Sequence, residues 1–278
     1  MKKAFFLFFC LLLQANLQSQ EMEIMTYNIR YLNETDGENS WSKRKDHLAG
    51  QIKFYEPGIF GVQEAVKQQL DHLKTNLAEY DYIGEGRDGG SKGEYSAIFF
   101  DTGKFDLLEE GTFWLSETPS KPSIGWDASY PRVCTYAKFE VKDSGEEFWV
   151  FNTHFDHQGV EARKKSSRMI IEKIKEINKE ELPAVLMGDL NLEPETEEIR
   201  FLSEKMEESK AVAKHVFGPE GTFNGYKFNE PVDRRIDYIF LSKGDFKVLK
   251  YAVLSDSKDL KYPSDHLPVM LIFKFRKD

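Results

Sequence analysis

Six short hydrophobic segments of the sequence each carry, at one end, a side chain that could bind a cation or move a proton. These side chains are Asn28, Glu64, His154, Asp189 with Asn191, Asp237, and the adjacent pair Asp265 and His266. A single Asn or Asp in such a place is usually a turn residue, but six segments with this feature indicate a shared site. If the segments are parallel strands of a sandwich, their ends converge on one rim with four carboxylates and two imidazoles.

Like charges packed together in this way need a cation or a proton to offset their repulsion. The sequence has no clustered thiolates, and oxygen ligands dominate, which favours a hard ion such as Mg²⁺ or Mn²⁺ over zinc. Mg²⁺ held by one or two carboxylates and a substrate phosphate is the usual arrangement for phosphoryl transfer. The histidines could then take a proton from water, stabilise the phosphorane or protonate the leaving oxygen.

Strand and helix patterns surround these residues. Runs rich in Ile, Val, Phe and Tyr predict strands at Glu23–Asn28, Ile59–Gln63, Tyr80–Gly84, Ala97–Phe100, Phe105–Thr112, Val133–Val141, Phe148–Thr153, Ala184–Gly188, Asp237–Leu241, Phe246–Leu254 and Val269–Phe275. Apolar residues three or four apart predict helices at Ser42–Tyr55, Val66–Leu77 and Glu161–Asn178. This content favours an α+β protein with two sheets packed face to face and helices outside.

The polar motifs together resemble those of the endonuclease/exonuclease/phosphatase superfamily and occur in that family's order. They are Thr26-Tyr27-Asn28, Gln63-Glu64, Asn152-Thr153-His154, Gly188-Asp189-Leu190-Asn191, Arg235-Ile236-Asp237-Tyr238 and Ser264-Asp265-His266-Leu267-Pro268. In motif they are closest to the nocturnin/deadenylase-like and 5-phosphatase-like branches. The resemblance implies a four-layer α/β/β/α sandwich of two mixed sheets, formed by residues 21–278 as one catalytic domain.

The resemblance also implies a metal site. Glu64 would be the main ligand of Mg²⁺, or of Mn²⁺ in its place, with Asn28 beside it. Asp265 would complete the shell, directly or through water. Arg30 departs from the pattern, because abasic endonucleases carry an acidic residue two positions after the asparagine, and this weakens a DNA-repair interpretation.

The remaining roles concern proton transfer and phosphate binding. By resemblance, His266 is the general base that activates the attacking water, and Asp237 holds its imidazole. Asp189 would position water or assist proton transfer. Asn191 would donate to a phosphate oxygen, and His154 would stabilise the charge that develops on the phosphate.

Four further basic side chains are candidate phosphate or substrate contacts: Arg44, Arg132, His157 and Arg163. His157 and Arg163 follow the pattern of the 5-phosphatases and sphingomyelinases, but His157 could equally cap a turn and Arg163 could simply begin a helix. Arg132 could be a phosphate clamp or a surface residue of a strand. The long segment Gly111–Tyr130 could bind a base, a sugar or a lipid, or its aromatic residues could pin it to its own sheet.

The first 20 residues have the layout of a secretory signal peptide. Met1-Lys2-Lys3 precedes the apolar run Ala4–Leu13, which is too short to cross a bilayer. We expect removal near Ser19 or Gln20 and a periplasmic or extracellular location, although Cys10 leaves a lipoprotein signal open. After cleavage only Cys134 remains, so an internal disulfide is excluded and the core must hold the fold alone.

The net charge limits the classes of molecule that the protein is expected to bind. The formal net charge is −9, and loss of Lys2 and Lys3 makes it −11, which excludes a protein that binds polyanions over its whole surface. The expected activity is phosphodiester or phosphomonoester hydrolysis, with a small molecule, a lipid head group or a nucleic acid as substrate. The alternatives are an extracellular nuclease with the same site, a metal-independent glycoside hydrolase and a non-catalytic binding module. A monomer without a stable protein partner is the default.

Overall fold

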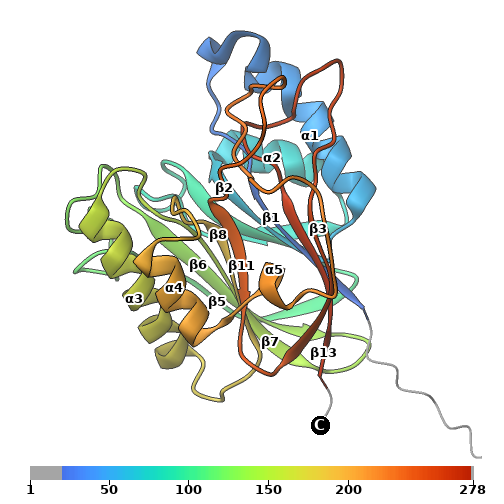
Figure 1. Ribbon diagram of the computed structural model, residues 1–278. Coiled ribbons are helices and arrows are strands. Elements are labelled where there is room, and N and C mark those ends of the chain that lie inside the picture. Colours follow the sequence, from blue (N-terminus) through green and yellow to red (C-terminus); the bar gives the residue numbers. More distant parts are fainter. Residues whose placement is uncertain (1–20, 277–278) are drawn as a thin grey trace, which may run out of the picture.

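Two mixed β-sheets pack face to face, and helices cover both of their outer faces (Figure 1). The computed structural model describes residues 21–276. Within that range the predicted four-layer sandwich is confirmed. The signal-peptide prediction for residues 1–20 lies outside the described residues. No helix among the described residues is long and apolar enough to cross a membrane.

The first sheet has seven strands and the second has six. In spatial order the first sheet contains β10 (His215–Phe217), β12 (Phe246–Val253), β13 (Val269–Phe275), β1 (Met22–Asn28), β2 (Ile59–Ala65), β4 (Tyr95–Asp101) and β3 (Tyr80–Ile83). The second contains β5 (Phe105–Trp114), β6 (Val133–Val141), β7 (Glu147–His154), β8 (Ala184–Asp189), β11 (Asp237–Leu241) and β9 (Glu207–Glu208). All eleven predicted strands are present. The short strands β9 and β10 were not predicted, because runs of two and three residues carry no readable alternation.

The helices fall into two outer layers. Their bounds are η1 (Glu34–Asn39), α1 (Trp41–Tyr55), α2 (Lys67–Asn76), α3 (Val160–Ile177), α4 (Glu197–Lys205) and α5 (Ser209–Val212). The three predicted helices correspond to α1, α2 and α3. Helix α4 was missed, although Ile199 and Leu202 lie three residues apart on its buried face.

Three apolar layers hold the four structural layers together. The central one lies between the sheets and includes Ile98 of β4 and Val150 of β7. A second lies between the first sheet and helices α1 and α2, where Leu48 is fully buried. The third lies between the second sheet and helices α3 and α4, with Ile170 and Leu202. Because both faces of each sheet are covered, the central strands are buried almost throughout.

The strand directions correct the expectation that the polar residues all lie at the ends of parallel strands. β1 and β2 are parallel, as are β7 and β8, so these four strands do end at the same edge. β11 runs antiparallel to β8, and β13 runs antiparallel to β1. Asp237 therefore reaches that edge from the first residue of its strand, and Asp265 and His266 reach it from the loop that leads into β13. An antiparallel strand that starts at this edge places a side chain there just as a parallel strand that ends there does.

A buried asparagine cross-links the two sheets directly beneath this edge. Asn152 of β7 donates from Nδ2 to the carbonyl oxygens of Val62 (3.1 Å) and Ala97 (2.8 Å) in the other sheet, and its Oδ1 accepts from Gln63 Nε2 (2.7 Å). The contact requires a glycine opposite, since a Cβ on Gly61 would lie 2.6 Å from Asn152 Cγ. The amide thus sets the spacing of the two sheets where the site is built.

We predict that Asn152→Ala destabilises the protein by about 3 kcal/mol or more, because two buried carbonyl oxygens and one amide lose their partner and each loss costs about 1–3 kcal/mol. Denaturant-induced unfolding measures the change. Asn76→Ala on the surface of α2 is the control and should shift the free energy of unfolding by about 0.5 kcal/mol or less. Equal stabilities of the two variants would show that this cross-link does not contribute.

Candidate active site

The strand register brings the predicted residues together at one edge of the sandwich. Asp189, the last residue of β8, stands opposite His154 of β7 on one side and Asp237 of β11 on the other. In the first sheet Asn28 at the end of β1 stands opposite Gln63, next to Glu64. These are adjacent positions on neighbouring strands, so the clustering follows from the hydrogen-bond ladder.

A cavity of about 580 Å³ opens at this edge. Eight of the predicted residues line it: Glu64, Arg132, His154, His157, Asp189, Asn191, Asp265 and His266. Asn28 and Asp237 lie behind this lining, fully buried, and contact it through hydrogen bonds. Ten of the twelve predicted residues therefore belong to one site.

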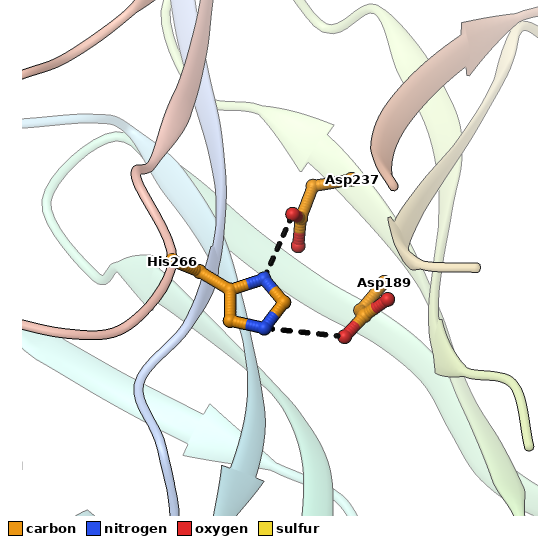
Figure 2. A group of neighbouring side chains, drawn as sticks. All are labelled: Asp189, Asp237 and His266. Carbon is orange, nitrogen blue, oxygen red and sulfur yellow. Dashed lines mark hydrogen bonds and ion pairs between the residues drawn. The ribbon is translucent and has the colours of Figure 1, made fainter. Parts of the chain in front are cut away.

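His266 and Asp237 are in hydrogen-bond contact, the geometry that a general base and its orienting carboxylate require (Figure 2). Asp237 Oδ2 lies 2.9 Å from His266 Nδ1, and Asp189 Oδ2 lies 3.8 Å from His266 Nε2. This arrangement places the proton on Nδ1 of a neutral imidazole and turns Nε2 toward Asp189 and the cavity. Phe223 packs edge-on against the ring, with the two centroids 5.1 Å apart, and limits its rotation.

Thr222, which was not predicted, fixes the orientation of Asp237. Its Oγ1 accepts hydrogen bonds from the backbone N–H groups of Ile236 and Asp237, both at 3.1 Å. With both lone pairs engaged, its single proton is directed to Asp237 Oδ2, 2.5 Å away. Thr222 is fully buried, so no water competes for this bond. A threonine fifteen residues before its partner gave no signal in the sequence.

The buried charges shift the pKa values of the histidines in opposite directions. Burial disfavours the charged form of His266, but the Asp237 and Asp189 carboxylates outweigh it and raise the pKa to about 10. Burial, and then the charge of Arg132, lowers the pKa of His154 well below its ordinary value. His154 Nε2 lies 3.0 Å from Asn191 Nδ2, so a neutral His154 accepts a hydrogen bond there. Burial and the neighbouring Asp237 raise the pKa of Asp189.

Two of the predicted side chains of the site, and also Arg30, stand on left-handed backbone, which is uncommon for residues other than glycine. Glu64 has φ 64° where the pairing of β2 with β4 shifts register, and Asn191 has φ 50°. Glu64 Oε1 accepts from Asn28 Nδ2 at 3.1 Å, and Oε2 accepts from the backbone N–H of Tyr31 at 3.1 Å. The carboxylate of Glu64 is therefore held in one orientation at the cavity wall.

Glu64 and Asp265 are the carboxylates best placed to hold a divalent cation. Both line the cavity, and Asp265 is almost fully buried with its pKa raised by burial, while His266 opposes the rise and Glu64 adds to it. Arg30 approaches both, with guanidinium–carboxylate distances of 3.9 Å, and it also pairs with Asp36. Two like charges with only a loosely placed guanidinium between them form an oxygen donor set that fits a hard cation.

A second group could also hold a cation, because one ligand atom each from Asp189, Asp237 and His266 lie within 4.8 Å of one another. Asp237 Oδ2 is already used by His266 Nδ1 and Thr222 Oγ1, but its buried Oδ1 has no hydrogen-bond partner. Asn28 presents its amide nitrogen to Glu64 and Asp189, while its Oδ1 accepts from the Arg30 backbone N–H. In this structure Asn28 therefore orients the Glu64 carboxylate.

Two predicted substrate contacts are not at the cavity. Arg44 is buried, and its guanidinium donates to backbone carbonyl oxygens of Ile29, Arg30 and Pro263, and of Asn39. It ties the loops around the rim together and has no donor aimed at the cavity. Arg163 lies in the first turn of α3 and donates to the carbonyl oxygen of Asp156. The simpler interpretation, a residue that begins a helix, is the one the structure supports.

The other two predicted substrate contacts, Arg132 and His157, line the cavity as a pair. Arg132 donates to Asp156 Oδ2 at 3.2 Å, and its Nη2 lies 3.0 Å from His157 Nδ1. Asp156 also accepts from the backbone N–H groups of Ser129, Gln158 and Gly159. These bonds dock the end of the long Gly111–Tyr130 segment against the site.

The sequence did not identify eight further lining residues as contacts: Arg30, Tyr31, Arg87, Glu94, Tyr130, Phe223, Arg234 and Ile236. Arg30 was named only as a departure from the family pattern, Ile236 only as part of a motif, and Tyr130 only as the end of its segment. Trp114, which the structure places at the end of β5, is buried and donates from Nε1 to the carbonyl oxygen of Arg87 at 2.7 Å. One aromatic residue of the predicted segment is thus pinned, as expected, and Tyr130 lines the cavity.

Comparisons with known proteins agree with this geometry. Residues 25–266 match the model of the endonuclease/exonuclease/phosphatase family. The chain is 40% identical to an endonuclease/exonuclease/phosphatase family protein of Bacteroides thetaiotaomicron, with a TM-score of 0.90 over 94% of this chain and all of that one. It is also 40% identical to the mannosyl-6-phosphatase Bt3783 of Bacteroides thetaiotaomicron VPI-5482, with a TM-score of 0.88 over 91% of this chain and all of that one. The human nocturnin catalytic domain shares the fold, with a TM-score of 0.74 and 21% identity over 92% of this chain and 95% of that one.

We predict that Asp237→Asn lowers the pKa of His266 by more than one unit in protein free of divalent cations, because the carboxylate is the main group that raises it to about 10. The His266 Cε1–H resonance, followed by NMR against pH, measures the shift. The ordinary pKa is 6.5, so the protonated imidazole stabilises the wild-type fold below that pH, and this stabilisation is lost as pH rises through 10. Asp46→Asn on the surface is the control, and an unchanged titration in Asp237→Asn would contradict the assignment.

Proposed function

The chain belongs to the endonuclease/exonuclease/phosphatase family, and from this premise we propose that it is a Mg²⁺-dependent phosphoesterase acting on a small phosphomonoester, with a sugar phosphate as the first candidate. Members of this family are hydrolytic phosphoesterases. The observation that carries the proposal is the oriented His266–Asp237 pair, which shares one cavity with the Glu64 and Asp265 carboxylates.

The side chains support an in-line attack of water on phosphorus. His266 would take the proton of the attacking water through Nε2, while Asp237 and Thr222 hold the ring in place. As the new bond to phosphorus forms, the bond to the leaving oxygen would break, and that oxygen would take up a proton from solvent and depart as an alcohol. Asn191 and His154 would contact the phosphate oxygens, since both line the cavity beside Asp189. A divalent cation on Glu64 and Asp265 would neutralise phosphate charge and, by its own positive charge, favour the neutral imidazole of His266.

The alternatives account for fewer of these groups. A glycoside hydrolase needs two carboxylates at a set separation and no buried imidazole pair. A binding module needs no threonine that directs Asp237 toward His266. A nuclease would use the same site, but the likeness to nocturnin, at 21% identity, extends to the fold alone. The 40% identity to a mannosyl-6-phosphatase over its whole length favours a sugar monoester.

Purified residues 21–278 should hydrolyse mannose 6-phosphate in the presence of Mg²⁺ faster than a generic diester, a phospholipid, or single-stranded RNA or DNA. Phosphate release measures the monoesters, and gel or chromatographic assays measure the rest. His266→Ala should lower kcat by about 10²–10⁴-fold, as expected for loss of general-base assistance. Activity that survives excess EDTA would contradict the metal requirement, and preferred cleavage of RNA or DNA would favour the nuclease.

A matched variant separates loss of the metal from loss of the base. Mg²⁺ should raise the thermal unfolding temperature of wild-type protein and of His266→Ala, because binding to the folded state alone stabilises it. Glu64→Gln should abolish that increase, since it removes the main ligand without changing the shape of the side chain.

We also propose that the protein is exported and that its first 20 residues are removed. The cationic start, the apolar run Ala4–Leu13 and the polar stretch that follows support this proposal. After expression in a bacterial host, mass spectrometry of the periplasmic or secreted fraction should find a mature N-terminus close to Gln20. An intact Met1 on folded, cytoplasmic protein would contradict export.

A further inference from the structure

A pair of side chains in the cavity wall has no role in the proposed proton and metal chemistry. Arg87 and Glu94 belong to the connection between β3 and β4, and neither lies in the six motifs that form the catalytic edge. We call them the hairpin pair. Arg87 Nη1 donates to Glu94 Oε2 at 2.7 Å, and the side chains are only 15% and 19% exposed. The pair is therefore part of the cavity and unlike a solvated surface ion pair, which contributes little.

Three contacts hold the hairpin pair in place before any substrate binds. The backbone N–H of Arg87 donates to the carbonyl oxygen of Glu94 at 2.9 Å. The Trp114 indole donates to the carbonyl oxygen of Arg87 at 2.7 Å. The Arg87 guanidinium stacks over the ring of Tyr130, 4.7 Å from its centroid. A recognition site prepared in this way does not have to be ordered when a ligand binds.

The charges of the cavity indicate what kind of group the substrate carries beside its phosphate. All four arginines that line the cavity are paired with carboxylates: Arg30 with Asp36, Glu64 and Asp265, Arg87 with Glu94, Arg132 with Asp156, and Arg234 with Glu193. No lysine is among the lining residues. A site for a polyanion needs unpaired basic groups along its length, so the remainder of the substrate is expected to be neutral.

The planar side chains of the cavity also disfavour a nucleobase. The Tyr130 ring already stacks with Arg87 and with His157, whose ring centroid is 6.2 Å away at 17°. Phe223 is engaged by His266 and by the Arg234 guanidinium, 5.1 Å from its ring centroid. Recognition of single-stranded nucleic acid relies on aromatic faces that accept bases.

The hairpin pair offers a hydroxyl group both a hydrogen-bond acceptor and a hydrogen-bond donor. A hydroxyl both donates and accepts, a carboxylate only accepts, and a guanidinium only donates. Burial raises the pKa of Glu94 to about 7, although the Arg87 charge opposes the shift. Two adjacent hydroxyls could donate to Glu94 and accept from Arg87 at the same time.

We propose that Arg87 and Glu94 form the subsite that binds neighbouring hydroxyls of the leaving group, and that this subsite selects a neutral polyol, a hexose, over other alcohols. The inference rests on the proposed function, because it names the substrate class of the same cavity. It assigns specificity to a hairpin that contributes nothing to the metal site.

The test compares two monoesters that share a phosphate and differ in the leaving group. Mannose 6-phosphate carries adjacent hydroxyls, and p-nitrophenyl phosphate carries none. Glu94→Gln and Arg87→Gln should each lower kcat/KM for mannose 6-phosphate by about tenfold to a hundredfold, the effect of losing a hydrogen bond that involves a charged group. For p-nitrophenyl phosphate the change should stay below about threefold. Glu197→Gln, which removes an exposed carboxylate paired with Arg168, is the matched control and should change neither value.

A binding measurement keeps this inference separable from the proposed function. Saturation-transfer NMR should detect free mannose on the wild-type protein and lose the signal in Glu94→Gln. If the wild type binds mannose through Glu94 but hydrolyses neither ester, the proposed function fails and the subsite stands. If both esters are hydrolysed and the hairpin variants lower the two kcat/KM values equally, or lower neither, the subsite is wrong and the function stands. Thermal unfolding verifies that each variant is folded. If Glu94→Gln does not fold, the same comparison with Arg87→Gln tests the subsite.

Discussion

The repulsion among buried carboxylates is the constraint on which the site depends. Glu64, Asp189, Asp237 and Asp265 meet at one edge of the sandwich, and three of them are almost fully buried. Such a group is stable only when each charge has a proton, a donor or a cation to offset it. Asp237 has donors on Oδ2 but none on its buried Oδ1, and Asp189 has an amide donor. Glu64 accepts from Asn28 and from the backbone N–H of Tyr31, and both Glu64 and Asp265 have Arg30 at 3.9 Å. Because Glu64 and Asp265 also line the cavity, they are the pair on which we propose a divalent cation.

At the same edge, neutral side chains fix the orientation of charged side chains through hydrogen bonds. Thr222 has one proton and two occupied lone pairs, so it can only donate to Asp237, and Asp237 then determines which nitrogen of His266 faces the cavity. Asn28 orients Glu64 in a comparable way from behind the wall. Because these orienting residues are buried, water cannot replace their hydrogen bonds, and the reactive groups keep one geometry.

The cavity divides into a charged part and a neutral part. The carboxylates and histidines lie at or near the strand ends, while the surrounding loops contribute arginines that are already paired with acids. Strand ends suit groups that must hold one position, and loops can vary in sequence without disturbing the sheets. A family with one catalytic core can therefore acquire different substrates through its loops.

The sequence by itself determined eleven of the strands, three of the helices and the layered fold, and polar residues next to strands marked most of the site, because hydrophobic alternation and strand-end polar residues are local signals. Only the tertiary structure decided the rest. It assigned Arg44 to backbone carbonyls and Arg163 to the first turn of α3, and it brought Thr222, Arg87 and Glu94 into the site. A basic or hydroxyl side chain looks the same in sequence whether it faces a cavity or a carbonyl group. Its partner lies far along the chain, and only the packing of the two sheets and their loops determines which partner it meets.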